Sequence, residues 1–232
     1  MQEEFTENGL VADRESEQIK SENHLKEAVE EQIVEPENAL PEVTLDKLPE
    51  LPRAACARVG WTKLLPVQAR AIPYILAGRN LMVQSHTGSG KTGAFLLPIL
   101  QRIDLAKRVC QALVLVPTRE LASQVSREAE LLGGGLGLRT AVVYGGVKYG
   151  PQLDAFRAGA QLVVGTPGRI LDHLLKGTLL LDHLQVFVFD EADRMLSMGF
   201  YPDMKRVQQF LPQQPINGYM FSATMPPFVI RL

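Results

Sequence analysis

The chain has 232 residues, of which 46% are hydrophobic and 22% are charged. This composition is typical of a soluble globular protein and excludes fibrous, collagen-like and low-complexity chains. The formal net charge of −2 conceals an asymmetry, because residues 1–42 carry 13 acidic and three basic side chains, whereas residues 43–232 carry 13 acidic and 21 basic ones. A basic body of this kind is expected of a protein that meets a polyanion.

The cysteines and the hydropathy pattern exclude further classes of protein. Cys56 and Cys110 are the two cysteines, and their spacing fits neither a disulfide framework nor a zinc site. No apolar stretch approaches the ~20 residues of a membrane-spanning helix, and the first residues are acidic, unlike a basic leader. We therefore expect no membrane partner and an intracellular, reducing location, in the cytoplasm or, in a eukaryote, the nucleus.

Residues 1–42 differ in composition from the rest of the chain. They are rich in Glu and contain Phe5 as their one aromatic residue. Too little apolar surface is present to offset the conformational entropy that ordering would remove. We expect a disordered, solvating acidic tail, and the alternative is a segment that binds a protein partner.

From residue 43 onward, short apolar stretches alternate with segments of helical periodicity, which predicts one domain over residues 43–232. Strands that are almost entirely apolar are typical of a sheet covered on both faces. The alternation predicts an α/β fold with a doubly wound, mostly parallel sheet and helices on both faces. The expected strands are 80–84, 112–116, 139–143, 161–164, 185–189 and 219–221, and the expected helices are 49–59, 67–76, 92–103, 120–132, 151–158, 168–175 and 202–210.

The segment after the first predicted strand has the pattern of a phosphate-binding P-loop. It reads Ser85-His86-Thr87-Gly88-Ser89-Gly90-Lys91-Thr92 and leads into a predicted helix. Its two glycines let backbone N–H groups turn toward an anion, and the helix dipole favours the same position. Lys91 can reach the β- and γ-phosphates, and the Thr92 hydroxyl can ligate Mg²⁺. The alternative is a glycine loop without a ligand, and the usual pattern has Gly where this chain has Ser85.

Polar segments also follow the other predicted strands. In a parallel sheet such segments gather at the carboxyl ends of the strands, where ligands bind. In chain order they read Pro117-Thr118-Arg119-Glu120-Leu121-Ala122, Gly145-Gly146, Thr166-Pro167-Gly168-Arg169, Asp190-Glu191-Ala192-Asp193 and Ser222-Ala223-Thr224.

The acidic segment complements the P-loop chemically. Asp190 ends an apolar strand, as does the carboxylate that holds Mg²⁺ in P-loop NTPases. Glu191 can orient an attacking water or accept its proton. The alternative is an acidic helix N-terminus that stabilises the helix dipole. Because Lys91 and Thr92 supply the other half of a Mg²⁺–nucleotide site, we favour a catalytic role.

These motifs, in this order, resemble the DEAD-box family of ATP-dependent RNA helicases. The resemblance rests on Asp-Glu-Ala-Asp at 190–193 together with segments 85–92, 117–122, 166–169 and 222–224. Gly60-Trp61-Thr62-Lys63 and Pro66-Val67-Gln68 are similar to the family's adenine-binding Q motif, over residues 43–71. The whole resemblance covers residues 43–232. It implies the first RecA-like lobe, which is a P-loop NTPase domain.

The resemblance implies ATP and Mg²⁺ as cofactors. Gln68, in the Q motif with Trp61, would hydrogen-bond the adenine edge, and residues 85–92 would bind the phosphates. Thr92 would ligate Mg²⁺, and Asp190 would hold it through water. Lys91, Asp190 and Glu191 would be the catalytic residues, with Glu191 positioning the attacking water.

The resemblance further implies a coupling segment and an RNA-binding surface. Asp193 would bond to Ser222 or Thr224 of the Ser222-Ala223-Thr224 segment and link the ATP site to lobe movement. RNA would be held by its phosphates and sugars, without sequence readout, because phosphate contacts position a strand but do not read it. The implied RNA residues are Pro117, Thr118, Arg119, Gly145, Gly146, Thr166, Pro167, Gly168 and Arg169.

The chain departs from the family pattern at three places. Ser85 and His86 stand where the family usually has Ala and Gln, and the position of the aromatic residue that stacks on adenine falls near Val43. No segment matching the family's second lobe, with its arginine finger, precedes Leu232. We therefore expect that residues 1–232 are one lobe of a longer protein and nearly inactive alone.

The predicted function is that of the ATP-binding lobe of an RNA helicase, whose RNA-stimulated ATP hydrolysis unwinds duplexes locally. One alternative is a single-lobe module that binds nucleotide and RNA without turnover. The other is a DNA-acting superfamily 2 relative, which the complete Asp-Glu-Ala-Asp sequence and Gln68 disfavour.

Overall fold

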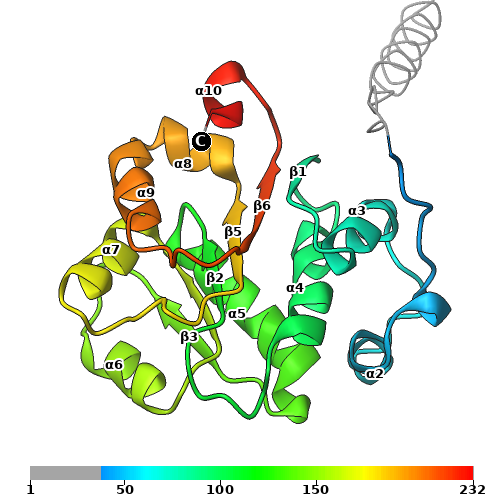
Figure 1. Ribbon diagram of the computed structural model, residues 1–232, viewed down its shortest axis with the longest axis horizontal. Helices are drawn as coiled ribbons and strands as arrows, with labels where there is room; N and C mark the ends of the chain where they lie inside the picture. Colours follow the sequence, from blue (N-terminus) through cyan, green and yellow to red (C-terminus); the bar gives the residue numbers. More distant parts are fainter. Residues whose placement is uncertain (1–37, 232) are drawn as a thin grey trace, which may run out of the picture. The chain divides into compact units, whose positions relative to one another are not determined.

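One parallel sheet of six short strands organises the described residues, 38–231 of the computed structural model (Figure 1). Every residue of its three central strands β2, β4 and β5 is buried, as expected of strands covered on both faces. The predicted parallel sheet is confirmed, and each strand lies within two residues of its expected bounds. The strands are β1 (Leu81–Gln84), β2 (Ala112–Leu115), β3 (Thr140–Val143), β4 (Leu162–Gly165), β5 (Val186–Asp190) and β6 (Asn217–Ser222).

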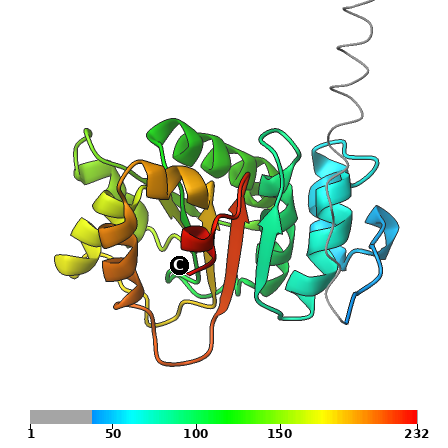
Figure 2. The ribbon, with the colours of Figure 1, turned by 90° about the horizontal axis from the view of Figure 1, so that it is seen from above.

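The order of the strands across the sheet is β1-β6-β5-β2-β4-β3, and all neighbours run parallel. Figure 2 shows β6, in red, beside β1, although the register partners Leu81 and Tyr219 are 138 positions apart in the chain. Chain order and spatial order therefore differ, and the last strand of the chain enters the sheet between the first and the fifth.

Helices cover both faces of the sheet. α2 (Glu50–Arg58), α3 (Pro66–Leu76), α4 (Lys91–Arg102) and α5 (Arg119–Gly133) contribute to one buried cluster, which also contains Val114 of β2. A second cluster contains the neighbouring residues Leu113 and Leu115 of β2. Its helices are α6 (Gly150–Arg157), α7 (Pro167–Leu175), α8 (Ala192–Ser197), α9 (Tyr201–Gln208) and α10 (Pro227–Ile230). Successive strand residues point to opposite faces, so the doubly wound α/β fold is confirmed.

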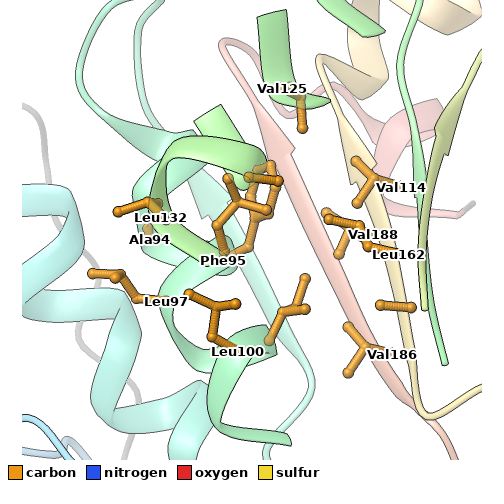
Figure 3. Packing of buried hydrophobic residues seen from close by; sticks show 14 of the residues in the cluster. Ala94, Phe95, Leu97, Leu100, Val114, Val125, Leu132, Leu162, Val186 and Val188 are labelled. Atoms are coloured by element: carbon orange, nitrogen blue, oxygen red, sulfur yellow. The ribbon is translucent and has the colours of Figure 1, made fainter. Parts of the chain in front are cut away.

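The first core cluster is built around α4. Figure 3 shows Phe95 and Leu100 of this helix between it and the sheet, with Val114 and Val188 on the sheet side of the cluster, whereas Leu97 lies on the side of α4 away from the strands. The Phe95 ring lies 5.3 Å from that of Phe221 in β6. Such apolar burial stabilises by about 25 cal/mol per Å² of surface removed from water. The same helix begins at the P-loop, so the core fixes the position of the loop.

Four short elements were not among the predicted ones. They are two 3₁₀ turns, Leu45–Lys47 and Gly134–Leu136, and the helices α8 and α10, of six and four residues. Helices this short carry too little periodicity to be recognised in a sequence. No helix in residues 38–231 combines the length and the apolar character that crossing a membrane requires. Residues Leu40–Leu232 form one compact unit, and residues 1–37 of the predicted acidic tail lie outside the described residues.

The segment before the sheet packs closely on α4. A Cβ atom added to Gly93 would lie 2.6 Å from Nε2 of Gln68 and 2.7 Å from the Trp61 ring. Gln68 is 2% exposed, and its amide bonds to the Leu65 N–H and to the Gly90 carbonyl at 2.9 and 3.0 Å. Gln68 can therefore not move aside freely.

Gly93→Ala should destabilise the fold by about 1–3 kcal/mol, the usual cost of overpacking a core. This cost exceeds the ~1 kcal/mol that Ala gains over Gly in a helix. Gly134→Ala is the matched control, because no atom lies within 4 Å of its added Cβ. Urea unfolding should show a lower stability for the first variant and an unchanged or higher one for the second. Equal stabilities would mean that the Trp61 and Gln68 packing is loose.

Candidate functional site

The loops that follow the six strands lie at one edge of the sheet, because parallel strands end in the same direction. The strand order divides these loops into two groups. β1, β6 and β5 are neighbours and lead into segments 85–92, 222–224 and 190–193. β2, β4 and β3 are neighbours and lead into segments 117–122, 166–169 and 145–146. The residues predicted to bind nucleotide and those predicted to bind RNA thus occupy adjoining halves of one edge.

The P-loop runs from the end of β1 to the start of α4. Gly88 and Gly90 have φ angles of 84° and 93°, in the left-handed region that glycine adopts without strain. α4 begins at Lys91, so the unpaired N–H groups of its first turn and its positive dipole end face the loop. The other predicted phosphate-binding residues are the exposed His86 and Thr87 and the half-buried Ser89 and Thr92.

Ser85 is the junction of the P-loop. Its N–H donates to the Ser222 carbonyl at the end of β6, at 2.9 Å. Its hydroxyl lies 2.7 Å from that of Ser89, across the loop. Its carbonyl accepts a hydrogen bond from Nζ of the buried Lys91, also at 2.7 Å. The Ser that replaces the family's Ala thus adds a hydroxyl contact within the loop, and the Lys91 ammonium is held at the loop's inner side.

Asp190 is a buried carboxylate at the end of β5. It is 3% exposed, and Oδ1 accepts a hydrogen bond from the Glu191 N–H at 3.0 Å. Burial raises the pKa of Asp190 from 3.8 to about 6, although the positive charge of Lys91 opposes the rise. A buried carboxylate with so little compensation is suited to a cation.

The donor atoms at this point fit Mg²⁺ bound together with a nucleotide. Among residues 38–231 there is no cluster of three or more His, Cys, Asp or Glu side chains that could hold a metal ion. Mg²⁺ does not require one, since one or two protein oxygens suffice when phosphates and waters complete its shell. Thr92 and Asp190 offer those oxygens.

Glu191 occupies the single position between β5 and α8. Its φ and ψ are 54° and 51°, and it is the one non-glycine residue with positive φ in the described part of the chain. This conformation costs about 1–2 kcal/mol, and such strain concentrates at functional sites. The side chain is 14% exposed and accepts a hydrogen bond from Nη1 of Arg194 at 3.1 Å. The helix after the turn therefore directs Arg194 back toward Glu191.

Asp193 is bonded to the segment that follows β6. Its Oδ2 accepts hydrogen bonds from the Thr224 N–H at 3.0 Å and the Thr224 hydroxyl at 2.7 Å. Its own N–H donates to Oγ of Ser222 at 3.1 Å. Burial alone would raise the pKa of Asp193, but the hydrogen bonds from Thr224 and Ser222 lower it more. Asp193 was predicted to bond to Ser222 or Thr224, and it contacts both, Thr224 through its carboxylate and Ser222 through its backbone N–H. Its role in lobe movement stays a prediction, as does any role of Ala223.

The Q-motif residues Gln68 and Trp61 lie against the start of α4, as described above. Gln68 uses one N–H on Gly90 and one lone pair on Leu65. An amide has two of each, so these two bonds use one donor and one acceptor position of the Gln68 side chain. Val43, at the position of the family's stacking aromatic, bonds through its N–H to the Ala69 carbonyl at 3.0 Å.

The other half of the edge is made of loops and helix starts. Thr118 caps α5, accepting a hydrogen bond from the Leu121 N–H at 3.2 Å, and Pro117 before it is buried. Arg119 is exposed and forms an ion pair with Glu120 at 2.8 Å. In the glycine loop, Gly145 and Gly146 are exposed, and Gly146 has a φ of 80°. After β4, Thr166 is the N-cap of α7, and Pro167 and Gly168 are its first two residues.

Arg169 is less available than the sequence suggested. Its side chain is 12% exposed, and Nη1 donates to the Val147 carbonyl at 3.2 Å. Its guanidinium lies over the Tyr149 ring, 4.3 Å from the centroid, and Nε lies 3.9 Å from Asp172. This side chain connects α7 to the glycine loop. Arg169 therefore contributes to the predicted RNA surface by contacting the glycine loop.

Sequence reasoning did not single out Tyr149, Gln152 or His173 as functional residues. Gln152 and His173 are 4% and 0% exposed and lie behind the glycine loop. A polar pair at buried positions of two amphipathic helices was the available signal, but only the fold brings the two residues together. The sequence also did not show how Arg194 pairs with Glu191.

Comparison with known proteins agrees with this geometry. The family model described as DEAD/DEAH box helicase matches residues 65–232. The chain is 46% identical over 186 residues to the ATP-dependent RNA helicase DeaD of Haemophilus influenzae, covering 80% of this chain and 30% of that protein. It is also 46% identical over 175 residues to DeaD of Escherichia coli K12, covering 75% and 28%.

A solved structure shows the same fold. The crystal structure of a DEAD box protein from the hyperthermophile Methanococcus jannaschii matches with a TM-score of 0.77 at 38% identity, covering 82% of this chain and 53% of that one. The chain belongs to the DEAD/DEAH box helicase family, and the predicted resemblance is confirmed. It spans less than a third of the length of the two DeaD proteins.

Asp190→Asn should stabilise the nucleotide-free protein at neutral pH. A carboxyl whose pKa is raised on folding loses stability as the pH rises from about 4 through 6, since ionisation is unfavourable in the folded state. Asn keeps the acceptor for the Glu191 N–H and carries no charge. The gain should reach up to about 3 kcal/mol above pH 7, at 1.36 kcal/mol per pKa unit, and vanish near pH 4.

Urea unfolding without Mg²⁺, at several pH values between about 4 and 8, measures this difference. Asp193→Asn is the control of opposite sign, because the pKa of Asp193 is lowered and its ionised form stabilises the fold at neutral pH. A pH-independent difference for Asp190→Asn would contradict the assignment of a strained buried charge.

Proposed function

We propose that this chain is the ATP-binding lobe of an RNA helicase that couples RNA-stimulated ATP hydrolysis to local duplex unwinding. One observation carries the proposal. In the strand order, the P-loop, the acidic segment 190–193 and the hydroxyl segment 222–224 follow three neighbouring strands. The predicted RNA loops follow the other three. Two ligands bound on adjoining halves of one edge influence each other through the loops between them. The matched DeaD proteins carry the name ATP-dependent RNA helicase.

Residues of the nucleotide half have distinct tasks in this proposal. The P-loop N–H groups and Lys91 would bind the phosphates, and Thr92 and Asp190 would hold Mg²⁺. Bound Mg²⁺ neutralises charge on the β- and γ-phosphates. Glu191 would orient the attacking water through the carboxylate oxygen that Arg194 leaves free, and its backbone conformation at the β5–α8 turn fixes where its side chain begins. Positioning and electrostatic stabilisation of this kind supply most of the catalysis in phosphoryl transfer.

The RNA half binds the strand by its phosphates and sugars. The first turns of α5 and α7, at Arg119 and Pro167, present N–H groups with a positive dipole. The exposed Gly145 and Gly146 let the backbone approach a phosphate closely. These contacts do not read bases, so binding is independent of sequence.

A second lobe completes the catalytic site in this proposal. Phosphoryl transfer depends on an arginine that stabilises charge on the γ-phosphate, and such an arginine contributes about 10³–10⁵ in rate. Within residues 38–231, the three arginines of the motifs at this edge already have partners. Arg119 pairs with Glu120, Arg169 with Val147 and Tyr149, and Arg194 with Glu191. In this proposal Arg119 and Arg169 serve the RNA half and Arg194 holds Glu191, so the arginine finger would come from the partner lobe.

Lys91→Ala should weaken Mg²⁺–ATP binding by about 1–3 kcal/mol, the scale of a lost hydrogen bond to a charged group. Titration calorimetry on the 232-residue chain measures the affinity. Lys107→Ala is the control, because this exposed lysine precedes β2, at the opposite edge of the sheet from the P-loop. RNA affinity of Lys91→Ala without nucleotide should not change. Equal ATP affinities of wild type and Lys91→Ala would refute the phosphate-binding role.

Arg119→Gln should show the reverse pattern. Arg119 is exposed at the start of α5, and its loss removes one cation from the RNA half. The affinity for single-stranded RNA should fall, and the slope of log affinity against log salt should drop by about 0.7, the value for one phosphate contact on a single strand. ATP affinity without RNA should not change. An unaltered salt slope would remove Arg119 from the RNA surface.

Gln68→Ala should reduce the preference for ATP over GTP. The remaining donor and acceptor of the Gln68 amide match the adenine N7 and N6 groups, whereas guanine offers two acceptors there. We expect wild type to discriminate by about tenfold or more, since an unpaired polar group costs 1–3 kcal/mol. Gln68→Glu, which keeps the acceptor and loses the donor, is the matched variant. If wild type binds both nucleotides equally, Gln68 serves only to join Leu65 to Gly90.

A further inference from the structure

Side chains of α6 and α7 hold the backbone of the glycine loop from behind. Nε2 of Gln152 donates to the carbonyls of Tyr144 and Lys148 at 3.4 and 3.3 Å. Nη1 of Arg169 donates to the Val147 carbonyl between them. Three carbonyls on both sides of the Gly145–Gly146 pair are thus fixed by side chains. Because the peptide planes are rigid, fixing these carbonyls restricts the directions of the adjoining N–H groups.

Gln152 is itself held by a buried histidine. Its Oε1 lies 3.1 Å from Nε2 of His173 in α7, and Nδ1 of His173 lies 2.8 Å from the Thr178 hydroxyl. The rings of Tyr149 and Phe156 pack edge-on to the imidazole, at 5.2 and 5.1 Å. The imidazole has no exposed surface, so packing and both hydrogen bonds fix its orientation.

The hydrogen-bond chemistry assigns the protons of this chain of side chains. Nε2 of Gln152 donates to two loop carbonyls, so the Gln152 atom that faces His173 is Oε1, which can only accept. The proton between Gln152 and His173 therefore belongs to Nε2 of His173. The Thr178 hydroxyl lies 2.8 Å from Nδ1 and 3.1 Å from the His173 carbonyl, which already accepts from the Thr178 and Leu179 N–H groups. The hydroxyl proton is therefore assigned to the shorter contact, and Nδ1 accepts it. Burial lowers the pKa of His173, and the nearby Arg169 and Lys176 act in the same direction against the opposing charge of Asp172. The neutral Nε2–H tautomer satisfies every atom of the chain.

We propose that Thr178, His173 and Gln152 form a positioning relay that holds the Gly145–Gly146 loop in its RNA-binding conformation. The proposal rests on the RNA-binding role given above to this loop. Two consecutive exposed glycines have large conformational freedom, and ordering them at binding costs about 1–2 kcal/mol per residue. A relay anchored in the core removes part of that cost before RNA arrives. None of the three side chains needs to touch the RNA.

The decisive variant is Gln152→Glu. A carboxylate keeps the acceptor for His173 and loses the donor to both loop carbonyls. Anisotropy with a labelled single-stranded oligouridylate should show an affinity roughly three- to tenfold weaker, the effect of one net hydrogen bond. Calorimetry should show unchanged Mg²⁺–ATP affinity. A purely structural role would move both affinities or neither.

Thr178→Val and Thr178→Ser form the second test, and they decide the matter if Gln152→Glu does not fold. Val keeps the shape of Thr and removes the hydroxyl that fixes the His173 tautomer, whereas Ser retains it. RNA affinity should fall for Val and recover for Ser. The salt slope of binding should be unchanged in both, because neither change removes a cation.

Measurements on the free protein separate this proposal from the proposed function. Nitrogen NMR of the imidazole should show the Nε2–H tautomer of His173 in wild type, and amide exchange at Gly145 and Gly146 should accelerate in Gln152→Glu and Thr178→Val. If wild type binds RNA and responds to Arg119→Gln, but the relay variants bind normally, the relay is refuted alone. If wild type binds no RNA, both the proposed function and the RNA role of the relay are refuted. In that case, accelerated exchange in the variants would still show a loop-ordering relay, without an RNA role.

Discussion

Parallel strand pairing is the constraint on which the rest of this structure depends. Because all six strands run in one direction, every segment that follows a strand is delivered to the same edge. The order β1-β6-β5-β2-β4-β3 then decides which segments become neighbours. Asp193 meets Thr224, and Ser85 meets Ser222, since their strands lie in the same half of the sheet. The core under α4 keeps these segments in register.

The nucleotide half carries features that reduce the stability of the fold. Asp190 is a buried charge without full compensation, Lys91 has a buried ammonium, and Glu191 has a left-handed backbone conformation. Each would be replaced by a neutral or relaxed residue if stability alone were selected. All three lie in the segments that follow β1 and β5, the two strands that pair with β6. This clustering is what a preorganised site for phosphate and metal requires, and the apolar layers on both sheet faces offset its cost.

The sequence predicted what depends on neighbouring residues. Apolar strands, helix starts and the P-loop glycines follow from local pattern, and all six strands were located from it. The strand order was not predicted, because pairing of β1 with β6 joins residues more than 130 positions apart. The sequence also assigned Arg169 to RNA by motif alone, whereas its partners Val147 and Tyr149 lie on another loop.

Likewise, Gln152 and His173 meet only when α6 and α7 pack on the same face. Short helices such as α8 were missed because one turn carries no periodicity.

The two halves of the edge meet where β5 lies beside β2, and charged side chains alternate across that border. On the β2 side, Arg119 pairs with Glu120, and on the β5 side Arg194 pairs with Glu191. The hydrogen bond from Arg119 lowers the pKa of Glu120, and the charge of Arg194 lowers it further. Glu120 and Arg194 therefore attract each other across the border. Because these side chains are largely exposed, this attraction is weak and is screened by salt, and it cannot by itself hold the two halves together.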